Sequence, residues 1–267
     1  MDEQKNPVPG AFASGFIRRE FEHLYLYTCW HVVTGFDPND VKVGHALPNR
    51  RYLRVALQAA VPRQPGIEAI GGYQEVVVPL YEGPAPPFCP LWHQDDIHVA
   101  HPDLNAVGLR VPFWHDVVKL QLPSDLHVSQ LQIVNEERVL RDTLVDPGEK
   151  CLVVGYPYGF SALGPRQPTP IVLTRFVASD RMLGRRQQQL LESIGAAGMS
   201  GGPTFIERAD DLLLFGMYTG AIYPDASRRE NEKVTALGTV SNLTGVFSGA
   251  FPLVRVPSRA HYNDHTN

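Results

Sequence analysis

Short apolar or alternating runs follow one another along almost the whole chain, and Pro, Gly, Asp or Asn bounds most of them. Such runs are typical of β-strands joined by turns, because successive strand residues face opposite sides whereas a helix repeats about every 3.6 residues. The expected strands lie in 11–21, 23–33, 52–61, 73–81, 106–113, 130–135, 150–157, 170–178, 203–207, 212–224 and 235–242. The pattern therefore predicts an all-β protein.

Helices are expected in only two places within this pattern. The run RRQQQLLESI at 185–194 is the one candidate for a helix of any length, and a short helix is expected near Asn242–Ser248. Between roughly Pro112 and Val145 the chain is expected to cross from a first set of strands to a second. We therefore predict an N-terminal domain at 1–120, a C-terminal domain at 121–255 and a polar tail at 256–267.

Composition and charge narrow the possible partners. The 23 glycines and 23 prolines are spread between the apolar runs, as turns between strands require. A formal net charge of -4 is far from the basic balance of a nucleic-acid-binding protein, so no nucleic-acid partner is expected. The N-terminus has no apolar run of signal-peptide length, and no segment approaches the length of a membrane span. We therefore expect a cytoplasmic protein with no membrane partner.

The cysteines and histidines give no metal-binding pattern. Cys29, Cys89 and Cys151 are an odd number without CxxC spacing, which favours free thiols over disulfides or a zinc finger. The histidines and aspartates of segment 93–101 fit no standard zinc motif, so this segment is expected to be a solvated loop. No metal site is predicted.

A glycine-dense segment, Gly198-Met199-Ser200-Gly201-Gly202-Pro203, presents one hydroxyl just before an apolar run. A serine hydroxyl is a poor nucleophile at neutral pH and needs an adjacent base and a site for the developing oxyanion. The glycines would let the backbone turn tightly enough to aim the amides of Gly198 and Ser200 at one spot. Alone, such a segment is more often only a turn.

A second element is Tyr27-Thr28-Cys29-Trp30-His31-Val32-Val33, with a histidine at the end of an apolar run. A T-x-x-H segment near the start and a G-x-S-G-G-P segment in the last third, in this order, resemble the trypsin-like serine peptidases. Gly155-Tyr156-Pro157 is similar to a turn common in bacterial and intracellular members. Leu214–Gly220 is similar to the strand that pairs with bound substrate.

This resemblance implies two six-stranded antiparallel β-barrels of the chymotrypsin type, with the active site in the cleft between them. It implies a serine endopeptidase that needs no cofactor and acts on a peptide or protein, with Ser200 as nucleophile and His31 as general base. Gly198 and Ser200 would form the oxyanion hole, and Tyr218 and Gly220 would contact substrate. Ile194 would form the floor of the primary pocket and select apolar or small side chains over Arg and Lys.

Trypsin-like peptidases have a third catalytic residue, an acid that orients the histidine, and here the sequence departs from the family pattern. Family members place an Asp before a strand of the form D-[VIL]-[AV]-x-L, and this register reads Asn105-Ala106-Val107-Gly108-Leu109 here. Asn105 is therefore the positional candidate for the group that orients His31, and Asp103, two residues earlier, is the alternative. An Asn there supplies no negative charge, which leaves open a catalytically weakened or inactive domain that binds peptides or protein partners.

Met199 bears on how such an enzyme would be activated. Secreted digestive members carry an Asp before the nucleophile, and it pairs with a newly cut N-terminal amine; Met199 cannot form that ion pair. The resemblance therefore implies a peptidase that is not activated by insertion of a new N-terminus, with activity set by loop order or by a regulatory protein partner.

Overall fold

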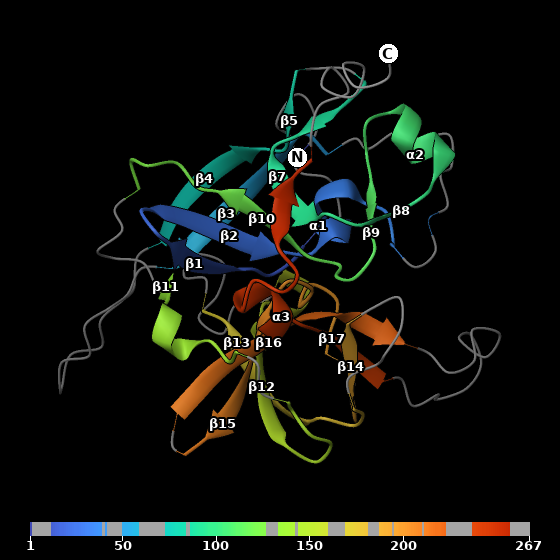
Figure 1. Cartoon of the computed structure of the whole chain (residues 1–267). Coiled ribbons are helices and arrows are strands. Elements are labelled where there is room, and N and C mark those ends of the chain that lie inside the picture. Colours follow the sequence, from blue (N-terminus) through green and yellow to red (C-terminus); the bar gives the residue numbers. More distant parts are fainter. Residues whose placement is uncertain are drawn as a thin grey trace.

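Two six-stranded sheets carry most of the regular structure in this computed structural model (Figure 1). The structure describes residues 1, 12–38, 41, 50–58, 73–83, 86–126, 133–141, 144–159, 169–180, 187–193, 195–209, 211–222 and 237–256. The predicted polar tail from 257 onward lies outside these residues. Strands dominate, so the prediction of a mainly β chain is confirmed.

The first sheet has the strand order β11-β1-β2-β10-β7-β18. Its strands are β1 (Phe16–Glu20), β2 (His23–Thr28), β7 (Trp92–Asp95), β10 (Val118–Gln121), β11 (Ile133–Val134) and β18 (Leu253–Arg255). Strands β1 and β2 form an antiparallel hairpin whose turn includes Phe21 at a φ of 52°. Strand β11 pairs with β1 in parallel. The expectation of a purely antiparallel arrangement is therefore wrong at this edge.

The second sheet has the order β13-β12-β15-β16-β17-β14, and all of its pairs are antiparallel. Its strands are β12 (Lys150–Gly155), β13 (Ile171–Phe176), β14 (Gln188–Leu191), β15 (Pro203–Arg208), β16 (Asp211–Ile222) and β17 (Leu237–Asn242). An antiparallel bridge between Val177 and Leu191 brings the β13 and β14 edges together at one point.

Smaller elements complete the described chain. The short strand pairs are β3 (Tyr52–Gln58) with β4 (Tyr73–Pro79), β5 (Tyr81–Glu82) with β6 (Cys89–Pro90), and β8 (His98–Val99) with β9 (Val111–Pro112). The helical elements are α1 (Trp30–Thr34), α2 (Pro102–Ala106), α3 (Thr244–Phe247) and the 3-10 turns η2 (Glu136–Arg138) and η3 (Pro157–Gly159). None of the helices in the described ranges combines the length and apolar character needed to cross a membrane.

Three sequence-based elements differ from the structure, and one helix is confirmed. The run predicted as a strand at 23–33 ends as β2 at Thr28, and Trp30–Thr34 form α1, so His31 lies on a short helix and not at the end of a strand. The segment predicted as the longer helix contains β14, whose Gln188 and Gln189 are buried and whose residues pair with β17. Cross-strand pairing overrides the moderate helix propensity of this run. The run predicted as a strand at 106–113 instead follows α2 and supplies only the two residues of β9. The short helix expected near Asn242–Ser248 is α3.

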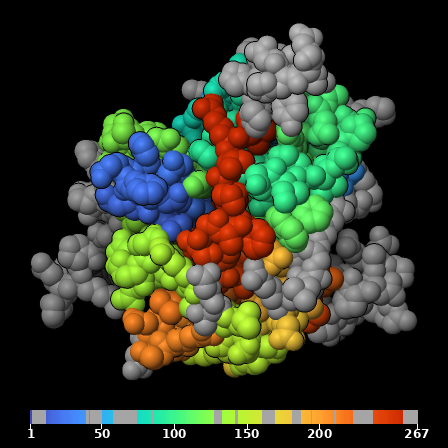
Figure 2. Space-filling view, viewed as in Figure 1, coloured from blue at the N-terminus to red at the C-terminus, as the bar shows by residue number. Residues whose placement is uncertain are grey.

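A shared apolar cluster joins the two sheets and places the site between them. It contains Phe16 and Tyr27 from the first sheet and Leu214 and Met217 from β16 of the second. After α3 the chain returns to the first sheet as β18, which runs between the blue and green segments in Figure 2. Strands β11 and β18 belong to the first sheet although both lie within 121–255, the range predicted for the C-terminal domain. The division into domains at 1–120 and 121–255 stays a prediction.

Candidate active site

Ser200 lies in a tight turn just before β15, and the turn depends on glycine at two positions. Gly198 and Gly201 have φ angles of 92° and 90°, in the left-handed region that favours glycine. A Cβ on Gly198 would lie 2.7 Å from the Tyr156 oxygen, and one on Gly201 would lie 2.1 Å from the Ser14 oxygen. The glycine-dense motif therefore has a steric reason at Gly198, two residues before the serine, and at Gly201, directly after it.

The turn leaves two backbone donors open on either side of Met199. In the described part of the chain, the N–H groups of Gly198 and Ser200 donate to no protein acceptor. Their neighbours are fixed: Tyr158 N–H donates to Ala197 O at 2.5 Å, and Gly202 N–H donates to Met199 O at 2.8 Å. Each open N–H shares a peptide plane with one of these bonded carbonyls, so its direction is set by the turn.

His31 lies where β2 passes into α1. Cys29 is the last extended residue before the helix, and Gly35, at a φ of 86°, ends it. Arg50 donates to the carbonyls of His31 and Val32 at 3.2 and 2.7 Å, which satisfies acceptors near the C-terminal end of α1. The His31 side chain is 28% exposed, so the ring is anchored but accessible.

Asp116 is the partner of His31. Its Oδ2 lies 2.6 Å from His31 Nδ1, and its Oδ1 accepts the His31 backbone N–H at 3.1 Å. The carboxylate is 4% exposed, so little water competes for its oxygens. An ionised carboxylate can only accept, so we assign the imidazole proton to Nδ1, which leaves Nε2 as the basic nitrogen.

The prediction that Asn105 or Asp103 orients His31 does not agree with the structure. Both side chains are exposed on α2, and in the described part of the chain neither is paired with His31. Helix α2 forms because Pro102 occupies its first turn and the His101 side chain accepts the Leu104 N–H at its start. The register taken from 105–109 therefore falls on a helix and the turn after it.

The sequence does contain the missed signal. Asp116-Val117-Val118-Lys119-Leu120 satisfies the pattern D-[VIL]-[AV]-x-L in full, and Val118 opens strand β10. Strand β10 pairs with β2 so that Val118 lies opposite Thr28. This pairing brings the residue at the start of β10 beside the residues that follow β2, and so Asp116 beside His31.

A buried carboxylate fixes the segment that leads to Asp116. Asp95 Oδ2 accepts the N–H groups of Trp114 and His115 at 2.6 and 2.7 Å. Its Oδ1 lies 3.0 Å from His115 Nδ1, and both side chains are almost fully buried. The interpretation of 93–101 as a solvated loop is therefore wrong for most of the segment, because 93–95 belong to β7 and His98 begins β8. Asp95 is buried and restrains the backbone just before Asp116.

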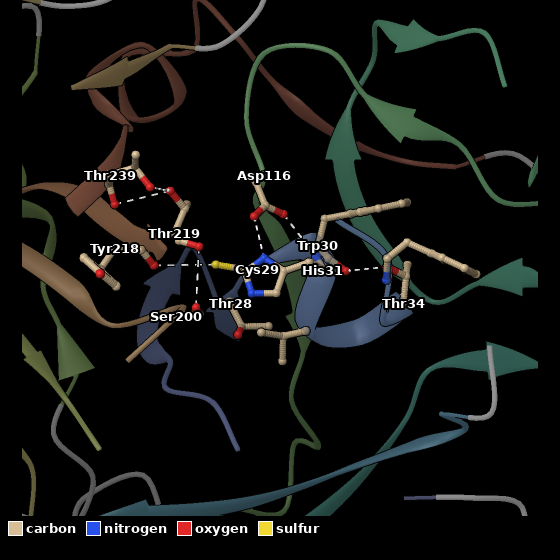
Figure 3. A network of polar contacts seen from close by, with 12 residues as sticks. Thr28, Cys29, Trp30, His31, Thr34, Asp116, Ser200, Tyr218, Thr219 and Thr239 are labelled. Carbon is tan, nitrogen blue, oxygen red and sulfur yellow. Dashed lines mark hydrogen bonds and ion pairs between the residues drawn. The ribbon is translucent and has the colours of Figure 1, made fainter. Parts of the chain in front are cut away.

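Ser200 and His31 line one cleft, together with Asp116, Thr219 and Gly220. In Figure 3 the imidazole lies between the Asp116 carboxylate and the Ser200 hydroxyl. The Tyr218 carbonyl contacts the segments that carry both side chains. It accepts the N–H of Gly201, next to Ser200, at 2.8 Å, and it lies 3.6 Å from Sγ of Cys29, two residues before His31. Ser200 Oγ itself lies 3.5 Å from Thr219 O.

The expected substrate contacts divide into three cases. Gly220 lines the cleft at a φ of 152°. Tyr218 does not line it, because the side chain is buried and its hydroxyl accepts Gly195 N–H at 2.7 Å. Ile194 lies outside the described residues, so the pocket floor stays a prediction.

One group of ligand-type atoms in the described ranges is close enough to suggest a metal. Atoms of Cys29, His31 and Asp116 lie within 4.8 Å of one another. However, the 2.6 Å contact between His31 and Asp116 is a direct hydrogen bond, with no room for an ion between those two atoms. Burial first, and the Asp116 charge second, raise the pKa of the Cys29 thiol well above its usual value. These residues fit a proton-transfer pair better than a metal centre.

The environment of His31 sets the pH at which it can act as a base. Burial, the largest influence, lowers the pKa of His31, but the charge and hydrogen bond of Asp116 raise it, and Asp37 adds to the rise while Arg50 opposes it. The net pKa lies above the usual value of 6.5. The imidazole is protonated below this pKa and accepts a proton only above it.

For a reaction in which His31 acts as the base, we expect kcat/KM to rise with pH along an acid limb whose midpoint lies above 6.5. In Asp116→Asn the raising influence of the carboxylate is lost, so the midpoint should move to lower pH. A kcat/KM profile of both proteins on one substrate checks this. A midpoint below the usual histidine value in the unaltered protein, or no shift in the variant, would contradict it.

No protein-family model matches the chain, and comparison with curated protein sequences gives no match either. Among solved structures, the chain is similar to a thermostable serine protease, AL20, from an extremophilic microorganism. The two share 13% sequence identity at a TM-score of 0.42, over 86% of this chain and 84% of that one. A TM-score this low supports no conclusion, so the function must be inferred from the geometry of the chain itself.

Proposed function

We propose that the chain is a serine endopeptidase of the trypsin-like kind, with its two sheets forming the two barrels of that fold. The observation that carries the proposal is the buried Asp116 carboxylate 2.6 Å from His31 Nδ1, in the cleft that Ser200 also lines. A serine needs a nearby base, and the base needs a partner that fixes its tautomer. His31 and Asp116 have the chemistry for these two roles.

In this proposal Ser200 Oγ attacks the peptide carbonyl while His31 Nε2 takes its proton. Asp116 stabilises the imidazolium that forms, and the N–H groups of Gly198 and Ser200 donate to the oxyanion. His31 then gives the proton to the leaving amine, and the C–N bond breaks to leave an acyl-enzyme on Ser200. Water, deprotonated by His31, attacks the ester, and the acid product leaves as Ser200 regains its proton.

The alternative, an inactive domain that only binds peptides, was motivated by an uncharged Asn105 at the position of the acid. Asp116 supports the active form instead, because its carboxylate supplies the charge that Asn105 lacks. No other observation on the described residues favours the binding domain.

Activation by a newly cut N-terminus is not part of the proposal. The side chain of Met199, immediately before Ser200, is fully buried in the apolar core of the second sheet. An uncharged thioether cannot hold a buried amine, which would cost several kcal/mol without a counter-charge.

We further propose a preference for small or apolar side chains on the acyl side of the cut. The Tyr218 ring packs against two glycines, Gly195 and Gly238. A Cβ added to Gly195 would lie 2.9 Å from the ring, and one added to Gly238 would lie 3.3 Å from it. Gly195 lies shortly before the turn 198–202 that carries Ser200, which we call the nucleophile turn. We propose that the ring limits the depth of the primary pocket and so disfavours long side chains. An apolar floor at Ile194, which the sequence predicts, would also disfavour Arg and Lys, because it offers them no counter-charge.

Replacing Tyr218 by Val should open this space. We expect the ratio of kcat/KM for Phe over Ala on the acyl side to rise by about tenfold or more, since added apolar groups in a pocket contribute 10- to 200-fold discrimination. Matched peptides that differ only at this residue measure the ratio. A profile dominated by Arg or Lys, or an unchanged ratio in the variant, would reject the assignment.

The proposed function is tested by peptide turnover. The purified chain is incubated with a mixture of unstructured peptides, and new termini are identified by mass spectrometry. We expect cleavage by the unaltered chain and none by the folded Ser200→Ala variant. Cleavage that survives in this variant, or none by the unaltered chain at any pH, would overturn the proposal.

A further inference from the structure

Ser14 lies just before β1 and bonds the nucleophile turn through both its backbone and its side chain. Its N–H donates to Ser200 O at 2.8 Å, and its hydroxyl donates to Gly198 O at 2.8 Å. The same hydroxyl accepts the Tyr156 N–H at 2.9 Å. Ser14 is only 6% exposed, so little water competes for these bonds.

These bonds act on the peptide planes next to the ones that carry the open N–H groups. The planes before Gly198 and before Ser200 are held by bonds within the second half of the chain, to Ala197 O and Met199 O. The two planes that alternate with them carry the carbonyls of Gly198 and Ser200, and both carbonyls accept from Ser14. The N–H groups of these two planes donate to Ala196 O at 3.0 Å and to Tyr218 O at 2.8 Å, so Ser14 completes the restraint on each plane. Gly198 lacks a Cβ, so its own conformation is the softest point of the turn.

Ser14 is itself held on the His31 side of the cleft. Thr28 Oγ1, three residues before His31, donates to Ser14 O at 3.0 Å. Glycine is needed for the close approach on two sides, because a Cβ on Gly155 would lie 2.7 Å from Ser14 Oγ and one on Gly201 2.1 Å from Ser14 O. Ser14 therefore links the strand that leads to His31 with the turn that carries Ser200.

We propose that Ser14 is a positioning residue that keeps the N–H groups of Gly198 and Ser200 aimed at a single oxyanion position. Its hydroxyl would restrain the turn by neutral hydrogen bonds. Met199 cannot restrain it through an ion pair, because its side chain carries no charge. The inference rests on the proposed function, since an oxyanion position has meaning only for acyl transfer. Ser14 touches no reacting atom, so its loss should weaken transition-state stabilisation and leave substrate binding intact.

The test compares Ser14→Ala with Ser179→Ala. Ser179 Oγ also accepts a backbone N–H from another segment, that of Leu190 at 2.9 Å, but away from the nucleophile turn. We expect kcat of Ser14→Ala to fall by about 10- to 100-fold, less than the 10²- to 10³-fold loss on removing an oxyanion donor outright. KM should stay within about twofold, and affinity for a peptide boronic acid, which forms a tetrahedral adduct, should fall by the same factor as kcat. Ser179→Ala should change neither.

Thermal melts establish that each variant is folded. Should Ser14→Ala fail to fold, Ser14→Cys fills the same space with a weaker hydrogen-bonding group, and a several-fold loss of kcat at constant KM is expected. Unchanged kcat in the folded Ser14 variant, or an equal loss in Ser179→Ala, would overturn the role of Ser14 while leaving the peptidase proposal standing. An unaltered chain that neither turns over peptides nor binds the boronic acid would overturn both.

Discussion

Replacing Ser200 by Ala is expected to lower kcat by about 10⁶-fold, the size of effect that loss of the nucleophile has in serine peptidases. The variant removes the hydroxyl that we propose forms the acyl-enzyme, and it leaves the rest of the turn unchanged. The measurement is the initial rate on a cleavable peptide at saturating concentration, taken from the linear part of the progress curve.

The fold should be unaffected by this change. The shape of the turn is set by Gly198, by Gly201 and by backbone bonds that include those from Ser14. The Ser200 hydroxyl contributes only one long contact of 3.5 Å. The free energy of unfolding should therefore change by less than about 0.5 kcal/mol. A residual rate within tenfold of the unaltered chain would show that another residue is the nucleophile.

Asp116→Asn is expected to lower kcat by about 10⁴-fold. The amide removes the charge that stabilises the imidazolium, and its NH₂ group would favour the tautomer with the proton on the nitrogen needed as base. The same change should shift the acid limb of the pH profile, as described above. Kinetics on one substrate, with circular dichroism to establish folding, measure the loss.

Asp103→Asn and Asn105→Asp are the matched controls for this prediction. Both positions are exposed on α2, so each change should alter kcat by less than about twofold. A large loss in Asp103→Asn, or a gain in Asn105→Asp, would mean that the acid had been assigned to the wrong residue.

The local motifs around the proposed nucleophile and base could be recognised from sequence because each depends on a few adjacent residues. The glycines beside Ser200 have positive φ angles or face backbone atoms closely, so their spacing carries the shape of the turn. Strand β2 is likewise a regular apolar run that ends shortly before His31. Neither motif requires knowledge of distant contacts.

Asp116, the proposed acid, was missed because the choice of register depended on whether 102–109 is extended. Pro102, the His101 cap and Gly108 at a φ of 85° make this segment a helix and a turn, whereas a short pattern match treats it as a strand. The full match at Asp116 was available, but only the pairing of β10 with β2 shows that it lies beside His31.

Long-range contacts explain the other differences. Gln189 is fully buried, and its side chain bonds Val145 O at 2.7 Å and accepts from Asn242 at 2.8 Å, which commits β14 to the sheet despite its helix-forming residues. Ser14 bonds a turn 184 residues away. No local pattern marks either residue, because their partners are set by how the two sheets pack.

Labelling by a fluorophosphonate tests the central claim most directly, because the reagent reacts with a serine only when a base activates it and donors hold the oxyanion. Intact-mass analysis of the folded chain should show one adduct, and peptide mapping should place it on Ser200. Ser200→Ala should take up no label, and His31→Ala should be labelled far more slowly. A folded, unaltered chain that takes up no label, or an adduct on another residue that persists in Ser200→Ala, would contradict the assignment of this site as a serine peptidase centre.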